Sequence, residues 1–155
     1  MYVPSIGEEI QPALNAGDLQ EVLRVTMEHF RADTGTIHVL ESDGVLHLKA
    51  ASAGIPPPVL DAVRLVPIGK GMAGLAVQRK EPISVCNLQT DMSGAARPGA
   101  KTTGMEGALV VPLLAGDEAV GALGIANRAP RAFTPEETAL LTGVGRAIAA
   151  LAPVK

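Results

Sequence analysis

The chain has 155 residues and a mass of 15.9 kDa, a size typical of one domain rather than two. Apolar residues make up 47% of it and charged residues 19%, with a formal charge of −3, which is the composition of a globular protein and not of a disordered one. Its pI lies near 5.6 and no Lys/Arg run exceeds the pair Arg79-Lys80, so the basic surface of a duplex-binding domain is missing and we expect no nucleic-acid partner.

The single cysteine, Cys86, excludes an intrachain disulfide and a multi-thiolate zinc site, and it favours a reducing compartment. Residues 1–16 lack the positive start and the apolar stretch of a signal peptide. Apolar runs long enough to span a membrane, about eighteen residues, do not occur. We therefore expect a soluble, cytoplasmic protein without a membrane segment.

The first part of the chain predicts a lead-in segment, a helix and a hairpin. Residues 1–16 are interpreted as an arm or a short lead-in helix, because prolines and a glycine interrupt the helical spacing. Asp18 caps a helix predicted over 18–33. Residues 36–53 form a hairpin if Asp43-Gly44 is its two-residue turn. That turn predicts three cross-strand pairs, which are Ile37 with Ala50, Val39 with Leu48, and His38 with Lys49.

Short elements and one long loop occupy the middle of the chain. A run of prolines favours a short helix over 58–64, followed by an extended segment at 65–68. An amphipathic helix over 72–79 and a strand over 83–88 come next. Residues 89–107 then form a glycine-containing loop of a length typical of functional lids.

The last part predicts a second hairpin and a capped helix. Residues 108–115 and 119–127 are strongly apolar, and the first of them has large side chains on both faces, as in a central strand. Pro112 cannot donate to the ladder, so we expect a bulge near it. Thr134, Pro135 and Glu137 form a capping box that opens a helix running to the end of the chain.

The order of these elements and several motifs resemble a GAF domain, a small-molecule regulatory module. The residues that carry the resemblance are Pro67 to Gly74, Pro82 to Leu88, Val111 to Leu114, Gly116 to Leu123, Asn127-Arg128 and Phe133 to Glu136. The match spans residues 17–152, preceded by the segment 1–16. It implies an α+β fold: a central antiparallel sheet of five or six strands, with long helices on one face and short helices plus the 89–107 loop on the other. Any ligand would lie beneath that loop.

Some chemistries of the family are disfavoured by departures from its motifs. Phosphodiesterase-type members carry Asn-Lys/Arg, then Phe, then Asp-Glu, but the last two places are Glu137 and Thr138 here, which weakens cyclic-nucleotide binding. Cys86 precedes the loop instead of lying in it, as a bilin-linking cysteine would. The free methionine-(R)-sulfoxide reductases of this family exchange several thiols, which one cysteine cannot complete within the chain.

Several motifs favour structural roles over chemical ones. The spacing Gly69-x-Gly71-x-x-Gly74 resembles a phosphate loop, but it lacks the surrounding strand-helix-strand unit, so we interpret it as helix packing. The three histidines, His29, His38 and His47, are scattered, and we expect a solvated face and no metal site. Cys86 is interpreted as a small buried apolar residue, with a reactive thiol as the minor alternative.

The loop over residues 89–107 holds the candidate ligand-binding side chains. Two cations and two hydroxyls, Arg97, Lys101, Thr102 and Thr103, could bind a small anionic or polar ligand, or they form a solvated loop. Met92 and Met105 are its large apolar side chains. On the later strand, Ala122 and Gly124 remove side-chain volume, which leaves a cavity or admits a closely packed helix. No catalytic residue and no cofactor is assigned.

The leading hypothesis is a non-enzymatic sensory or regulatory domain that binds a small molecule beneath residues 89–107 and signals through its first and last helices as a homodimer. Because little chain follows the last helix, we expect the effector to be a separate partner or part of a longer protein. The alternative is a ligand-free dimerisation scaffold, based on the alanine-rich last helix. A redox sensor that uses Cys86 is the third hypothesis.

Overall fold

The computed structural model describes residues 5–90 and 104–151. Within them, the elements in chain order are α1 (Ile6–Ala16), α2 (Leu19–Phe30), β1 (Thr34–Leu40), β2 (Val45–Ala51), α3 (Pro57–Ala62), β3 (Leu65–Pro67), α4 (Gly71–Arg79), β4 (Ile83–Val85), β5 (Gly107–Ala115), β6 (Glu118–Asn127) and α5 (Pro135–Leu151). No helix of these two segments has the length and apolarity needed to cross a bilayer.

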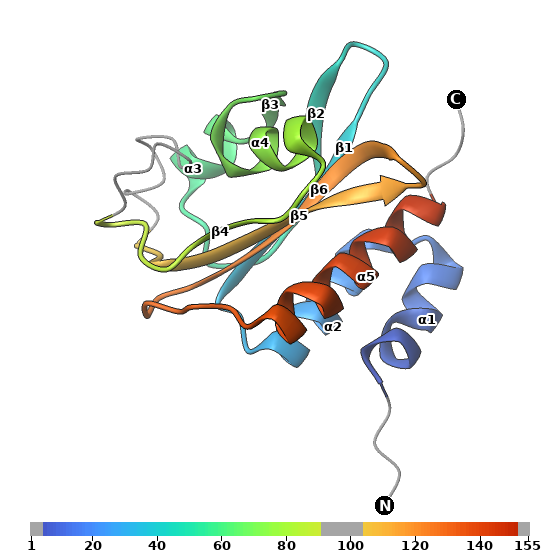
Figure 1. Cartoon of the computed structure of the whole chain (residues 1–155), viewed down its shortest axis with the longest axis horizontal. Coiled ribbons are helices and arrows are strands. Elements are labelled where there is room, and N and C mark those ends of the chain that lie inside the picture. The colour runs from blue at the N-terminus through green and yellow to red at the C-terminus, as the bar shows by residue number, and fades with distance from the viewer. Residues whose placement is uncertain (1–4, 91–103, 152–155) are drawn as a thin grey trace, which may run out of the picture.

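The strands form one six-stranded antiparallel sheet in the order β3-β2-β1-β6-β5-β4. The helices α1, α2 and α5 cover one face, and the shorter α3 and α4 lie on the other (Figure 1). The α+β architecture expected from the sequence is therefore confirmed, with six strands.

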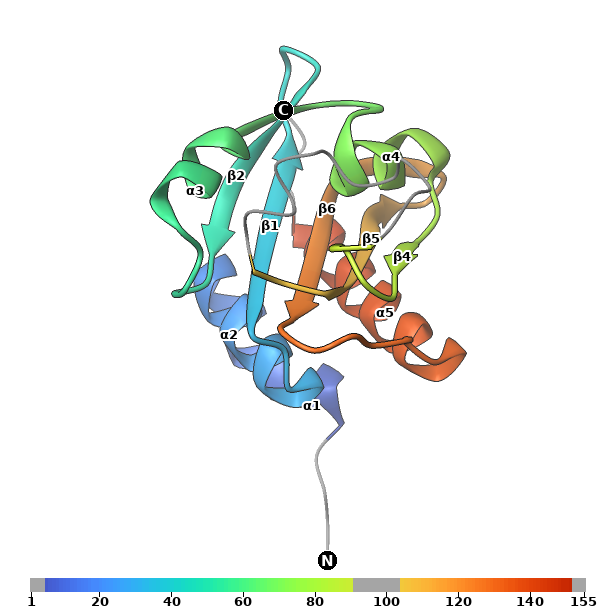
Figure 2. The ribbon, with the colours of Figure 1, turned by 90° about the vertical axis from the view of Figure 1, so that its left-hand side faces the viewer.

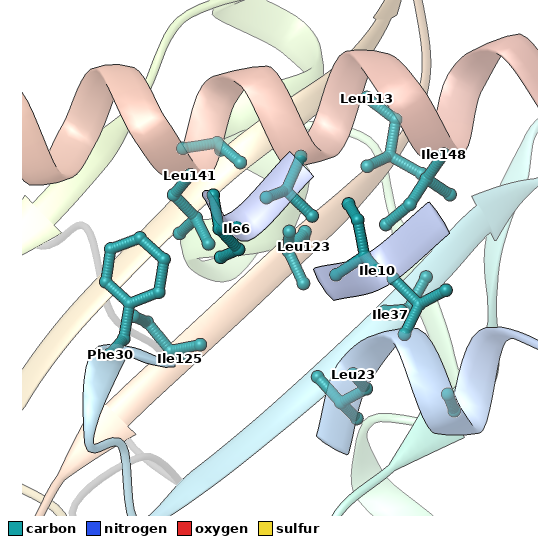
Figure 3. Close-up of a cluster of buried hydrophobic side chains, with 14 of the residues drawn as sticks. Ile6, Ile10, Leu23, Phe30, Ile37, Leu113, Leu123, Ile125, Leu141 and Ile148 are labelled. Carbon is teal, nitrogen blue, oxygen red and sulfur yellow. The ribbon is translucent and has the colours of Figure 1, made fainter. Parts of the chain in front are cut away.

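Large aliphatic side chains fill the space between the sheet and α1, α2 and α5 (Figure 3). The segment before residue 17 takes part, because Ile10 of α1 is 1% exposed and lies in the same cluster as Leu23 of α2 and Ile37 of β1. Ser5 and Glu8 form a capping box at the start of α1, which stabilises a helix despite Pro12 in its interior. The residues of α1 thus form a helix that packs on the main core.

The opposite face carries two smaller clusters. One lies under α4 and contains Leu46, Val66, Ala76, Val77, Ile83, Val110, Ala119 and Ala122; the other contains Val85, Leu88, Met105 and Ala108. Gly74 permits α4 to approach β3 closely, because a Cβ there would overlap the Pro67 carbonyl oxygen. The packing role expected for this glycine is confirmed.

The register of the first hairpin differs from the expected one. Ile37 pairs with Ala50 as predicted, but a bulge at Lys49 then pairs His38 with Leu48 and Val39 with His47. The extra residue reverses the alternation of β2, so Ala50 enters the α1/α2/α5 core while Leu46 enters the cluster under α4. The predicted pairs of His38 with Lys49 and of Val39 with Leu48 are wrong.

The turn of this hairpin is also longer than predicted. Glu41 N–H donates to the Val45 carbonyl at 3.1 Å and Gly44 N–H donates to the Glu41 carbonyl at 3.0 Å, so three residues form the loop. Gly44 alone of these has a positive φ, 78°, and the Asp43 carboxylate instead accepts from the Val45 N–H at 3.0 Å. This Asx turn, in which the Asp43 side chain accepts from the backbone two residues later, stabilises the loop although Asp43 does not adopt a positive φ.

The other boundaries follow the sequence closely. Asp18 caps α2 through the Glu21 N–H, and Thr134 with Glu137 forms the predicted capping box of α5. The bulge expected at Pro112 is not found there: Pro112 pairs with Ala122, and the register shift comes after Leu113, where Val120 of β6 is the extra residue. The strand β4 pairs only with residues 108–110 and does not reach Pro112. The strand predicted over 83–88 ends earlier, at Val85.

Candidate functional site

The candidate site is the middle of the sheet on the α3/α4 face, formed by β1 and β6. Thr36 pairs with Gly124 and His38 pairs with Ala122, and these four residues lie on the same face because their neighbours Ile37 and Leu123 enter the opposite core. Figure 2 looks onto this face: α3 lies beside β2, α4 lies over β5 and β6, and no described helix covers β1 between them. We call Thr36, His38, Ala122 and Gly124 the strand floor.

His38 is the polar residue at the centre of the strand floor. It is 3% exposed, and its Nε2 lies 2.8 Å from the carbonyl oxygen of Val63, which follows α3. A carbonyl only accepts, so the Nε2 carries the proton and the Nδ1 presents a lone pair. The Nδ1 is buried and has no hydrogen-bond partner among the residues that the structure describes.

Burial also determines the charge of His38. It lowers the pKa of the imidazole below its ordinary value, and the hydrogen bond to the Val63 carbonyl opposes this shift only in part. The ring is therefore neutral at pH 7. The solvated face predicted for the histidines is wrong at this position: the chain after α3 contacts the ring through the Val63 carbonyl, and the bulge at Lys49 places Leu48, not Lys49, opposite His38.

Two predicted site residues lie in the strand floor itself. Ala122 is 1% exposed and packs in the cluster under α4, so here the small side chain admits a helix. Gly124 has no helix residue as its nearest neighbour: a Cβ there would lie 3.1 Å from Val110 Cγ2 and 3.6 Å from Thr36 Oγ1. The space beside Gly124 is therefore bordered by the Thr36 hydroxyl and by a methyl group of Val110.

Met105 is the predicted site residue from the described end of the loop. It is buried with Val85, Leu88 and Ala108, beside Ala126 of β6. The chain is fixed there by backbone contacts, because the Leu88 N–H donates to the Glu106 carbonyl at 2.6 Å and the Gln89 side chain donates to the Met105 carbonyl at 2.8 Å. Both ends of the 89–107 loop are thus attached to the edge of the same face.

The remaining predicted residues lie outside the described part of the chain. They are Met92, Arg97, Lys101, Thr102 and Thr103. Their proximity to the strand floor stays a prediction.

Cys86 is exposed, which corrects its interpretation as a buried apolar residue. It follows β4 instead of lying within a strand, and its carbonyl accepts from the Arg131 N–H at 3.0 Å. The Cys86 carbonyl is therefore hydrogen-bonded, while the residue is exposed to solvent. Across residues 5–90 and 104–151, no three His, Cys, Asp or Glu side chains converge as metal ligands would.

Sequence analysis missed Arg131, which joins three separated segments. Its guanidinium donates to the Phe30 carbonyl at 2.7 Å, to Asn127 Oδ1 at 2.8 Å and to Glu137 Oε2 at 2.6 Å, and it lies 4.4 Å from the Phe133 ring centroid. The Thr134 N–H, which donates to Glu137 Oε1, and then the Arg131 guanidinium hold the pKa of Glu137 below its ordinary value. Glu137 thus has an ion-pair partner, although it departs from the family's Asp-Glu motif. This cluster fixes the connection between β6 and α5 and lies away from the strand floor.

The family profile for the GAF domain matches residues 16–151 of the chain. The chain belongs to the GAF domain family. Members of this family are small-molecule sensing and regulatory modules, and the sheet with its two unlike helix layers is their fold.

Solved GAF structures resemble this domain over nearly its whole length. The GAF domain of an Acinetobacter phosphoenolpyruvate-protein phosphotransferase has a TM-score of 0.78 at 19% identity, covering 94% of this chain and 89% of that one. The corresponding domain from Coxiella burnetii has a TM-score of 0.77 at 24% identity, with the same coverage of 94% and 89%. The free methionine-R-sulfoxide reductase of Neisseria meningitidis, solved with its substrate, has a TM-score of 0.75 at 14% identity and coverage of 97% and 93%. No curated protein matches the chain.

Proposed function

We propose that this GAF domain is a non-enzymatic sensor that binds a small molecule beneath residues 89–107, against the strand floor. One observation carries the proposal. The α1/α2/α5 face is filled with large aliphatic side chains, whereas the middle of the other face combines small residues with His38, a buried polar group. Apolar walls with a few placed polar groups are typical of small-molecule sites.

The chemistry of the loop indicates what part of the ligand it would bind. Arg97 and Lys101 are cations, and Thr102 and Thr103 add hydroxyls. Together they would bind a polar or anionic end, while Met92 and Met105 supply apolar contact. The ligand is therefore a small polar or anionic metabolite.

The single cysteine of the sequence supports a sensor over a reductase. The Neisseria meningitidis neighbour is a methionine-R-sulfoxide reductase, but at 14% identity the likeness concerns the fold alone. This chain has one cysteine, Cys86, so a second thiol for resolving an oxidised first one is missing from its sequence.

Signalling would use the helices on the far face. α1 and α5 contact each other and both belong to the core that Ile37 of β1 enters. A homodimer through these first and last helices, in the cytoplasm, would place the output on the face opposite the ligand.

Thermal shift and calorimetry against a panel of anionic and polar metabolites test this function. Arg97→Gln with Lys101→Gln should weaken the binding of any hit by about tenfold or more, the loss expected for charge-assisted hydrogen bonds. Arg79→Gln with Lys80→Gln is the matched control, because it removes two exposed cations at the end of α4 and leaves the loop unchanged. A panel without a saturable hit, or equal losses in both double variants, would contradict the proposal.

The second candidate function, a ligand-free dimerisation scaffold, is favoured by the exposed side of α5. Leu140 is 45% exposed and Leu151 is 37% exposed, and alanines between them would allow another helix to approach. Light scattering at micromolar concentration distinguishes it: a stable dimer without any metabolite effect supports the scaffold, and a monomer removes it.

A further inference from the structure

The buried, unpartnered nitrogen of His38 specifies one part of the ligand. A buried acceptor without a donor is costly, and the structures of folded proteins leave few of them. His38 Nδ1 meets neither solvent nor a donor from the described part of the chain, although the other nitrogen of the same ring makes a 2.8 Å hydrogen bond to Val63. The ring is thus held in one orientation with its lone pair unused.

We propose that His38 Nδ1 accepts a hydrogen bond from the ligand, so that the sensor selects small molecules with an N–H or O–H donor at their buried end. This proposal rests on the proposed sensory function and adds the chemistry of a second ligand contact. The first contact, from the loop cations and hydroxyls, binds a polar or anionic end. The second contact is His38 on β1, and an anion that only accepts hydrogen bonds cannot donate one to its Nδ1.

The neighbours of His38 agree with a donor and not with a charged group. Ala122 lies beside it on β6 and Leu48 lies beside it on β2, so the surroundings on both strands are apolar. The charged side chains near this end of the sheet pair with each other, Asp61 with Arg64 at 3.0 Å and Glu41 with Lys49 at 3.3 Å. A neutral N–H or O–H group is therefore the partner that this position stabilises best.

Two probes with the same acetyl carbonyl, one with N–H donors and one with N-methyl groups in their place, test the proposal on the unaltered protein. Acetamide has N–H donors, and N,N-dimethylacetamide has the same carbonyl without them. Each is titrated into ¹⁵N-labelled protein, with the His38 ring nitrogens and the amides of Ala122 and Gly124 observed by NMR. We expect acetamide to shift the unprotonated Nδ1 resonance saturably and to bind about two- to tenfold more tightly than dimethylacetamide, as one neutral hydrogen bond predicts.

Two substitutions separate the ring nitrogens. His38→Gln places an amide where Nε2 lies, which keeps a donor for the Val63 carbonyl and removes the Nδ1 acceptor. His38→Asn places an amide near Nδ1, which keeps the acceptor and loses the Val63 contact. We expect the preference for acetamide to disappear in His38→Gln and to persist in His38→Asn, with circular dichroism verifying that each variant is folded.

The outcomes distinguish this inference from the function on which it rests. If both probes shift Ala122 and Gly124 equally and leave Nδ1 unchanged, the face binds small molecules but His38 does not select them, and the inference is overturned. If neither probe shifts any of these signals, the inference also fails. The metabolite panel is independent of the two probes, and a hit whose binding is unchanged in His38→Gln would likewise leave the function intact and remove the role of His38.

Discussion

The Arg131 cluster predicts a large loss of stability on substitution at one surface-reaching arginine. Arg131→Met keeps most of the aliphatic stem but removes hydrogen bonds to Phe30, Asn127 and Glu137, together with the contact to Phe133. Hydrogen bonds to charged groups contribute about 1.5–3 kcal/mol each, and partial exposure reduces that value, so we expect a loss of about 3 kcal/mol in the free energy of unfolding. For a chain of this size that loss lowers the Tm by about 6–12 °C.

Arg128→Met is the matched control, because the same residue type lies three positions earlier in the chain. Its side chain is 63% exposed, against 22% for Arg131, and it reaches Asp33 at 3.4 Å. Exposed ion pairs contribute about 0–1 kcal/mol, so this variant should unfold close to the wild-type midpoint. Urea unfolding followed by far-UV circular dichroism measures both. Equal losses in the two variants, or less than about 1 kcal/mol for Arg131→Met, would refute the reasoning from burial and hydrogen-bond number.

Four further predictions concern the stability of the fold. Ile10→Ala should cost about 2–5 kcal/mol in urea unfolding, because Ile10 is 1% exposed in the main core; a neutral result would mean that α1 is not part of the folding unit. Gly121→Ala should cost about 3 kcal/mol or more, since a Cβ there would overlap the His38 carbonyl oxygen, whereas Gly143→Ala in α5 meets nothing within 4 Å and should raise stability by about 0.5–1 kcal/mol. The lowered pKa of Glu137 contributes stability above its ordinary value of 4.5 that is lost as pH falls through the lower folded value, so Glu137→Gln should flatten the acid limb of the stability curve. The lowered pKa of His38 likewise makes stability fall as pH drops below 6.5, and His38→Gln should remove this limb and leave the Glu137 limb unchanged.

Local sequence rules predicted the parts of the fold whose causes are local. The box at Thr134 and Glu137 needs only residues three apart, and it forms as expected. The cap of α2 likewise needs only Asp18 and the Glu21 N–H, three positions later. In these places one short segment contains both the cause and its effect.

The candidate site could not be predicted in the same way, because its key features depend on distant residues. His38 is buried against the Val63 carbonyl, 25 positions later in the chain, and the bulge at Lys49 places Leu48 opposite it. That bulge lets Ala50 and Leu46 enter cores on opposite faces of the sheet. The role of Arg131 requires the Phe30 carbonyl, 101 positions earlier in the chain. Periodicity within one segment carries no information about either contact.

The strand β1 contributes side chains to both faces of the sheet, so a displacement of β1 by a bound ligand would affect the packing of α1 and α2. His38 faces the strand floor, while the residue before it, Ile37, is fully buried with Ile10 of α1 and Leu23 of α2 (Figure 3). Packed interiors transmit small displacements because they have few voids. A ligand that engages the His38 ring and shifts β1 would therefore alter the packing of Ile37 against both helices. Ile37→Val should then weaken the response of α1 and α2 amides to acetamide while leaving its affinity at His38 within about twofold, because the substitution removes one methylene from the far face only.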